Sequence, residues 1–313
     1  MNGRTSNCLM RRVRLRRLFC ISLWIAWIFF RSWAALEAQD STRVFVQVTG
    51  SSGETVTDLA EDEFVVKENE IYCGILSAER STQPMRIALL VDNSGQIEKV
   101  GALLPLRNAL DVFLSTIQSH HEVALFTIGG NIQWRVDFTS DRTALRDAAG
   151  EIFSDSGGGP ILLDGIKETW ERRYGGGDEW PVFVVVMTDG PESSDSMIAR
   201  SEPQYNEFVA ELVEGSATVH VVLLSTRGGS MATNFAINLT QNTSGVYRPL
   251  AAATGLSGAL AELALRMNEH YQDVADRYQL EFECPGESGA IVQAGVSRRG
   301  ATVQLYADRR MPQ

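Results

Sequence analysis

The stretch IALLVDNSGQ, residues 87–96, joins five apolar residues to a short polar loop. The apolar part predicts a buried strand, and Asp92, Ser94 and Gln96 follow it where the strand gives way to a loop. Magnesium and similar hard ions prefer oxygen ligands, so an acid followed two residues later by a serine is typical of a metal-binding loop. The amide oxygen of Gln96, on a longer stem, is a weaker ligand. The stretch therefore indicates either a metal site or the scaffold of one without its ion.

Predicted strands and helices alternate around this stretch, from Met85 to about His270. The runs VFVVVM (182–187) and VHVVLLS (219–225) are continuous rather than alternating in their apolar residues, which is typical of strands covered on both faces in a parallel sheet. A helix is expected from about residue 100 to 118, because its apolar residues recur with a period of 3.6. The pattern predicts an α/β fold with a doubly wound, mostly parallel sheet between helices.

The two ends of the chain have β character. Short strands are expected in residues 39–84 and again in residues 275–313. Each segment is too small to bury a core alone, so we expect the two to pack together as a small β-sandwich into which the α/β domain, residues 85–274, is inserted. Period-two alternation places Cys73 and Cys284 on the apolar faces of their strands. A disulfide between them is expected in an oxidising compartment, and two separate buried thiols are the alternative.

Residues 1–38 have the pattern of an export signal. Seven arginines and no acidic residue occur in residues 1–34, which include the apolar segment LFCISLWIAWIFF, residues 18–30. A membrane span needs about 20 apolar residues, so this shorter segment favours a signal peptide, with a small-residue cleavage motif at Ser32 and Ala34. An uncleaved anchor is the alternative, and it is the one attachment to a membrane that we expect. The protein is predicted to be exported to the periplasm, the cell surface or the medium.

The charge of the chain narrows the class of partner. Of 28 basic residues, seven lie in the signal; the remaining 21, set against 39 acidic residues, give the mature chain a net charge of −18. This charge disfavours nucleic acids and anionic membrane surfaces as partners. The four histidines show no metal-ligand spacing and are expected to have structural roles, with His270 on a helix surface: His120, His121, His220 and His270.

Three predicted loops lie at the carboxyl edge of the sheet, where open parallel sheets bind ligands. They are DNSGQ (92–96), SGGGPILLD (156–164) and TDG (188–190). This order of strands and loops resembles the von Willebrand factor type A domain over about 180 residues. In that family a metal-ion-dependent adhesion site uses an Asp-x-Ser-x-Ser loop, a threonine in a second loop and an aspartate in a third. The resemblance implies that Asp92, Ser94 and Asp189 stand at positions of metal ligands.

Two positions depart from the pattern of that family. Gln96 replaces the second serine, and Pro160 stands where the family has its threonine. Magnesium and manganese take about six oxygen ligands, and Ser94 is the one direct hydroxyl ligand that remains. We therefore expect weak binding of Mg²⁺ or Mn²⁺ by Asp92, Ser94 and Asp189, or none, and no required cofactor.

Without an ion, the carboxylates of Asp92 and Asp189 repel each other unless hydrogen-bond donors surround them. The donors expected from the sequence are the amide of Gln96, the hydroxyl of Ser94 and the N–H groups of the loops. On this hypothesis the glutamine takes the place of the ion.

The flanking residues extend the resemblance. The segment GETVTDLAEDEFVVKENE, residues 53–70, resembles the opening before the type A domain in exported bacterial VWFA-related proteins, a group abundant in Acidobacteria, in which a β-rich tail also follows. The resemblance implies a non-enzymatic adhesion or scaffold module that binds a protein partner. The alternatives are a metal-dependent adhesion module and, less favoured because a nucleophile elbow is missing from the sequence, a hydrolase. The expected binding edge consists of Asp92, Ser94, Gln96, Pro160 and Asp189.

Overall fold

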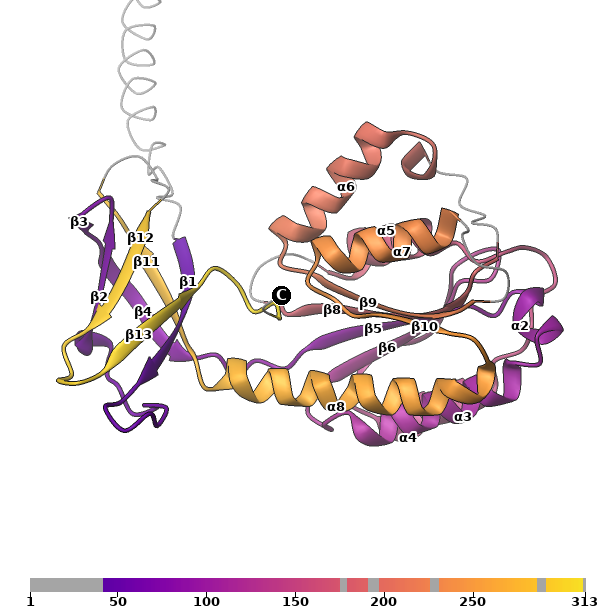
Figure 1. Ribbon diagram of the computed structural model, residues 1–313, viewed down its shortest axis with the longest axis horizontal. Helices are drawn as coiled ribbons and strands as arrows, with labels where there is room; N and C mark the ends of the chain where they lie inside the picture. The colour runs from indigo at the N-terminus through magenta and orange to yellow at the C-terminus, as the bar shows by residue number, and fades with distance from the viewer. Residues whose placement is uncertain (1–41, 175–178, 191–196, 226–230, 286–290, 312–313) are drawn as a thin grey trace, which may run out of the picture. The chain divides into compact units, whose positions relative to one another are not determined.

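The computed structural model describes residues 42–174, 179–190, 197–225, 231–285 and 291–311 (Figure 1). The residues from Arg43 onward belong to one compact unit. The predicted export signal, residues 1–38, lies outside the described residues. Among those that are described, no helix is both long and apolar enough to cross a membrane.

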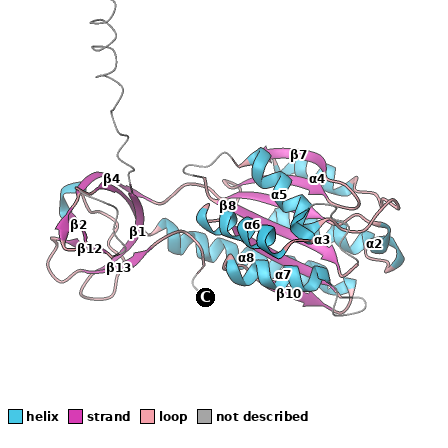
Figure 2. Ribbon diagram, turned by 90° about the horizontal axis from the view of Figure 1, so that it is seen from above, coloured by secondary structure: helices cyan, strands magenta, loops and turns pink. Residues whose placement is uncertain are grey.

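Six strands form the central sheet, in the order β10-β9-β8-β5-β6-β7 (Figures 1 and 2). They are β5 (Arg86–Val91), β6 (Glu122–Thr127), β7 (Gln133–Thr139), β8 (Pro181–Thr188), β9 (Thr218–Leu224) and β10 (Tyr247–Leu250). Neighbouring strands are parallel except β6 and β7, which pair antiparallel at one edge. The order reverses between β5 and β8, so the prediction of a doubly wound, mostly parallel sheet is confirmed.

Helices cover both faces of this sheet (Figure 1). The helices of this part are α2 (Gly95–Lys99), α3 (Leu103–Thr116), α4 (Arg142–Gly150), α5 (Leu162–Arg173), α6 (Glu202–Glu214), α7 (Met231–Asn242) and α8 (Leu256–Ala275), with short 3₁₀ turns at Met197–Ala199 and Ala253–Gly255. A third 3₁₀ turn, Glu61–Glu63, precedes the α/β part. Along β5, Ile87 and Leu89 pack against α3, α4 and α8, whereas Ala88 and Leu90 pack against α5, α6 and α7. This burial on both faces explains why the strand is continuously apolar.

The helix expected from about residue 100 begins at Leu103 instead. Gly101 has a φ of +66°, a backbone conformation that favours glycine and ends the short helix α2. The loop after β5 therefore leads into one helical turn, a break and then the long helix α3. The carboxyl end of β5 is covered by α2 rather than by the first turn of α3.

Two antiparallel sheets combine the ends of the chain, in the orders β13-β1-β11-β4 and β12-β2-β3. Their strands are β1 (Thr42–Thr49), β2 (Phe64–Glu68), β3 (Ile71–Tyr72), β4 (Gly74–Arg80), β11 (Tyr278–Glu283), β12 (Val292–Val296) and β13 (Thr302–Tyr306). Val46, Phe64 and Leu280 are buried in one shared core. The prediction that the two terminal segments pack together, with the α/β part inserted between them, is confirmed.

A disulfide joins Cys73 to Cys284, as the alternation of the two strands predicts. The Cα atoms are 4.3 Å apart and the cysteines are separated by 211 residues in sequence. Both pack against the core shared by the two small sheets. Closing a loop of this length restricts the unfolded chain, and the chain-entropy model gives about 5 kcal/mol as an upper figure for the stabilisation.

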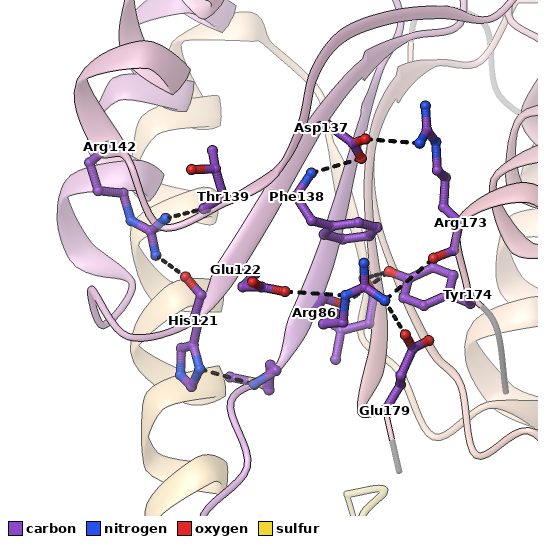
Figure 3. A network of polar contacts seen from close by, with 12 residues as sticks. Arg86, His121, Glu122, Asp137, Phe138, Thr139, Arg142, Arg173, Tyr174 and Glu179 are labelled. Atoms are coloured by element: carbon purple, nitrogen blue, oxygen red, sulfur yellow. Dashed lines mark hydrogen bonds and ion pairs between the residues drawn. The ribbon is translucent and has the colours of Figure 1, made fainter. Parts of the chain in front are cut away.

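A closed polar network lies at the amino end of β5 (Figure 3). The guanidinium of Arg86 forms ion pairs with Glu179 and with Glu122, the latter at 3.3 Å. It also lies 4.1 Å from the centre of the Phe138 ring, and the hydroxyl of Tyr174 donates to the backbone carbonyl of Arg86 at 2.9 Å. The charge at this end of the sheet is therefore balanced by neighbouring side chains.

His121, at the start of β6, is a structural histidine, in agreement with the sequence. The backbone N–H of Met85 donates to its Nδ1 at 3.1 Å. Burial, with smaller contributions from the charges of His120 and Arg142, lowers the pKa of His121 to about 3. His121 therefore stays neutral in the folded protein at any pH near neutrality.

The expected position of His270 was wrong. The sequence places it on a helix surface, but it is buried in the structure. Its Nε2 lies 2.6 Å from the carbonyl oxygen of Arg309, and its ring meets Trp180 edge-on. Residues after β13 pack over this part of α8, with Met311 in the same core. A helix pattern cannot show that a distant segment of the chain covers the exposed face.

Candidate functional site

The two aspartates singled out from the sequence lie at the point where the strand order reverses. Asp92 follows β5 and Asp189 follows β8, and these strands are paired in parallel with Val91 opposite Val186. The backbone N–H of Asp92 donates to the carbonyl of Val186 at 2.8 Å. Both side chains are buried, with 0% and 4% exposure. The structure thus brings the first and third loops to one edge of the sheet.

The second loop reaches the same edge. The N–H of Asp155 donates to the carbonyl of Asn93 at 2.6 Å, and Pro160 forms an isolated β-bridge with Gly129. A Cβ atom added to Gly190 would lie 3.3 Å from Cδ of Pro160, so Pro160 touches the third loop as well. All three loops therefore meet around the positions predicted from the sequence.

Asn93, which the sequence analysis did not identify, links the loop after β5 to the loops after β6 and after α4 by hydrogen bonds. Its Oδ1 accepts from the N–H of Gly129 at 2.9 Å, and its Nδ2 donates to the carbonyl of Phe153 at 3.0 Å. A Cβ atom at Gly129 would lie 2.4 Å from the backbone nitrogen of Ser94, so only glycine allows this close approach. The edge is consequently a fixed arrangement rather than three independent loops.

The carboxylate of Asp92 is occupied by donors of the protein itself. The N–H of Ser94 donates to Oδ1 at 2.7 Å. The N–H and the hydroxyl of Thr188 donate to Oδ2 at 3.0 and 2.6 Å. Three such bonds stabilise the charge of a buried carboxylate. Thr188 was quoted in the TDG loop, but its role as a donor was missed.

The donors to Asp92 differ from those expected. A backbone N–H does contribute, but neither the amide of Gln96 nor the hydroxyl of Ser94 is among them. Gln96 is the second residue of α2 and is half-buried. The hypothesis that the glutamine replaces the ion beside Asp92 is therefore wrong. Thr188 on the adjacent strand donates the side-chain hydrogen bond to Asp92 that was expected from Gln96.

Asp189 has a donor from a third strand. The hydroxyl of Ser225, directly after β9, donates to Oδ2 of Asp189 at 3.2 Å, and the N–H of Asp189 donates to the carbonyl of Leu224 at 3.1 Å. Burial and, to a smaller degree, the charge of Asp189 raise the pKa of Tyr247 on β10. Ser225 was another donor that the sequence analysis missed, because its position at the end of an apolar run carries no motif.

The side chain of Ser94 differs from those of its neighbours. It is completely buried, and its hydroxyl has no hydrogen-bond partner within the described part of the chain. A serine hydroxyl in this position fits a hard metal ion, but Pro160 offers no side-chain oxygen and both oxygens of Asp92 already accept hydrogen bonds. Among the described residues, the side chains at the family's ligand positions supply fewer than the six oxygen ligands that magnesium or manganese takes.

The strand order, the antiparallel edge strand and the three converging loops define the von Willebrand factor type A fold. Among solved structures, a von Willebrand factor type A protein from Catenulispora acidiphila aligns with a TM-score of 0.50 and 10% identity, over 86% of this chain and 73% of that one. BatB from Bacteroides thetaiotaomicron aligns with a TM-score of 0.47 and 12% identity, over 59% of this chain and 99% of that one.

A third similar structure, proximal thread matrix protein 1 from the mussel byssus with a zinc-occupied MIDAS motif, has a TM-score of 0.49 and 12% identity, over 66% of this chain and 49% of that one. No protein-family model and no curated protein matches the sequence. At 10% identity, the likeness to the Catenulispora acidiphila protein shows the fold alone.

Proposed function

We propose that this protein is an exported, non-enzymatic binding module that holds a protein partner at the carboxyl edge of its type A fold without requiring a divalent metal ion. The fold itself is common among modules that mediate protein binding. The residues that we assign to the binding edge are Asp92, Ser94, Gln96, Pro160 and Asp189.

The observation that carries the proposal is the set of donors around Asp92. Ser94 and Thr188 provide three hydrogen bonds to this carboxylate, so the protein stabilises a charge that a metal ion stabilises in an intact adhesion site. Pro160 stands at the position of a lost hydroxyl ligand and packs against Gly190. Binding at this edge then depends on the shape and hydrogen bonds of the loops.

Two features support export. The disulfide between Cys73 and Cys284 is typical of an oxidising compartment. Residues 1–38 have the pattern of a signal, and retention of that segment provides the one membrane attachment in this proposal.

Capture from an envelope extract tests the proposal. The mature protein is immobilised, and partner recovery is compared with and without EDTA for the wild type, Gln96→Arg and Gln272→Arg. The last is the matched control, because Gln272 is an exposed glutamine of α8 near the amino end of the sheet. We expect recovery to survive EDTA, to fall about tenfold in Gln96→Arg and to be unchanged in Gln272→Arg. Equal recovery in both variants would contradict the proposed edge.

The unpartnered hydroxyl of Ser94 favours a second candidate, a metal-dependent adhesion module. In this alternative Asp92, Ser94 and Asp189 hold Mg²⁺ or Mn²⁺, and an acidic residue of the partner completes the coordination. Loss of capture on adding EDTA, restored by excess Mg²⁺ and absent in Ser94→Ala, would replace the first proposal with this one.

A further inference from the structure

Strand β13 lies at the free edge of a small sheet. In the order β13-β1-β11-β4 it pairs with β1 and with no other strand of the described residues. All five residues of β13 are in regular antiparallel register with β1. The backbone N–H and C=O groups on its other side therefore have no strand partner within the described part of the chain. Such an edge is a template for pairing with another strand.

Most other sheet edges carry features that hinder such pairing. β7, at one edge of the central sheet, is charged at Arg135 and Asp137, and its register with β6 is irregular. β10, at the opposite edge, has four residues and includes Pro249, which lacks a backbone N–H. β3 has two residues, and the register of β4 shifts where it pairs with β11. β13 has no charge, no proline and no irregularity in its pairing with β1.

β12, at the edge of the smaller sheet, is the other uncharged candidate. Ala294 and Gly295 lie in the middle of this strand, and such small residues offer little side-chain surface to a partner strand. In β13, by contrast, Thr302, Val303 and Tyr306 are of types that are enriched in strands. β13 is therefore the edge best suited to accept another strand.

An apolar side chain on the inner face of β13 is left uncovered. Leu305 pairs with Val46, and residues directly opposite each other in an antiparallel pair share one face of the sheet. Val46 is completely buried in the core of the two small sheets, whereas Leu305 is 38% exposed. A strand added along β13 would bring a side chain of its own against Leu305 and remove apolar surface from water.

The sequence of β13 is complementary to itself. When two copies pair antiparallel about a two-fold axis at Gln304, Val303 lies opposite Leu305 of the second copy, and Thr302 lies opposite its Tyr306. Apolar side chains then meet on the inner face of the joined sheet. Gln304, which is exposed, meets its own counterpart on the outer face. This pairing opposes no like charges, which suits a chain whose acidic residues outnumber its basic ones.

We propose that β13 pairs antiparallel with β13 of a second copy of this chain, so that two four-stranded sheets join into one in a symmetric dimer. The two-fold axis passes through Gln304. The pairing supplies backbone hydrogen bonds to the free edge and covers Leu305 with Val303 of the second copy. None of the residues assigned to the binding edge takes part, so the inference is independent of the proposed function.

Sedimentation equilibrium of the mature protein, from about 1 µM to 1 mM, tests the proposal. One pair of short strands is a small interface, so we expect a reversible monomer–dimer equilibrium with a Kd of roughly 10–100 µM. Gln304→Lys and Gln304→Glu each place like charges across the axis. Each should weaken dimerisation about fivefold and leave the monomer folded, because the side chain is exposed.

A mixture of the two variants separates this axis from any other contact. Mixing Gln304→Lys with Gln304→Glu places opposite charges across the axis, so the mixed dimer should form at least as well as that of the wild type. Gln293→Lys is the matched control, because Gln293 is an exposed glutamine in the neighbouring edge strand β12. This change should leave dimerisation unaltered.

A wild-type protein that stays monomeric up to about 1 mM would overturn the inference. A dimer that neither change at Gln304 weakens, no recovery in the mixture, or equal weakening in Gln293→Lys would also overturn it, because each result places the contact elsewhere. The capture experiment with Gln96→Arg reports separately on the carboxyl edge of the central sheet.

Discussion

The two ends of the central sheet differ in how fully their polar side chains are paired. At the amino end, Arg86 is surrounded by Glu122, Glu179, Phe138 and Tyr174, which balance its charge and cover its stem (Figure 3). At the carboxyl edge lie the three buried hydroxyls without a partner among the residues described: Ser94, Thr127 and Ser154.

The other buried polar atoms without a hydrogen-bond partner among the described residues are side-chain nitrogens of arginines and of His121, and some of these side chains bond through another atom. His121, for example, accepts through Nδ1, and Arg142 donates to the carbonyls of Gln118 and His121. Unsatisfied hydroxyls lower stability, and a fold retains them where they have a use. From this comparison we expect substitutions at the amino end to affect mainly stability and substitutions at the carboxyl edge to affect mainly binding.

The largest expected effect is at the amino end. Arg86→Leu removes two ion pairs and leaves Glu179 and Glu122 facing a less polar surface, so we expect a loss of about 2–3 kcal/mol in the free energy of unfolding. Denaturant unfolding measures this change. Capture of the partner by the folded variant should be unchanged, and a selective loss of capture would show that the amino end also binds.

A matched pair of threonines sharpens the comparison within the carboxyl edge. Thr188 and Thr127 are both buried residues at the ends of strands, but only the hydroxyl of Thr188 donates to a carboxylate. Thr188→Val should cost about 2 kcal/mol in unfolding free energy, whereas Thr127→Val should cost nothing. Equal losses in the two variants would mean that the hydroxyl of Thr127 is satisfied in solution.

The next effect is a dependence of stability on pH. Burial lowers the pKa of His121 to about 3, below its unfolded value of about 6.5. The unfolded chain therefore binds a proton more readily, and the stabilisation present above pH 6.5 is lost as the pH falls toward 3. Between pH 6.5 and 5 this residue should account for about 1–2 kcal/mol.

His121→Asn should reduce that dependence in unfolding experiments, because the amide oxygen can accept from Met85 without titrating in this range. At the exposed neighbour His120, burial and then the charge of Arg142 also lower the pKa, so His120→Asn should reduce the dependence too, but by less than His121→Asn. His220, whose pKa burial also lowers to about 3, should maintain the remainder. Identical pH profiles for the wild type and His121→Asn would show that His121 is not buried in solution.

The smallest expected effect is that of Ser94→Ala. Its hydroxyl has no partner in the described structure, so removing it should leave the unfolding free energy unchanged or slightly raised in the absence of metal. A loss of about 2 kcal/mol or more is the size expected for a buried hydrogen bond to a charged group. Such a loss would indicate that the hydroxyl of Ser94 has an unrecognised partner.

Local patterns in the sequence predicted the scaffold well. Continuous apolar runs predicted strands buried on both faces, and β5, β8 and β9 are such strands. Alternation with a period of two placed Cys73 and Cys284 on the apolar faces of their strands, and the expected disulfide between them is present. These features depend on neighbours in sequence and on the geometry of single elements, so the sequence alone contains them.

The site could be predicted only in part. The motifs indicated Asp92 and Asp189, but the donors around them, Thr188 and Ser225, come from neighbouring strands whose register no local pattern specifies. Burial of His270 under the C-terminal residues and the pairing of β13 with β1 likewise depend on segments that are distant in sequence. Long-range packing decides which polar side chain finds a partner, and that information lies outside the motif.

The most direct test of the central claim, that protein donors stand in for a metal ion at this edge, is a calorimetric titration of the mature wild-type protein with MnCl₂, alongside its melting temperature. A bound ion at 100 times its Kd would stabilise the fold by about 2.7 kcal/mol. We predict no saturable binding below about 1 mM and no rise in melting temperature. One-site binding at micromolar concentration, with a rise in melting temperature that Ser94→Ala abolishes, would contradict the account.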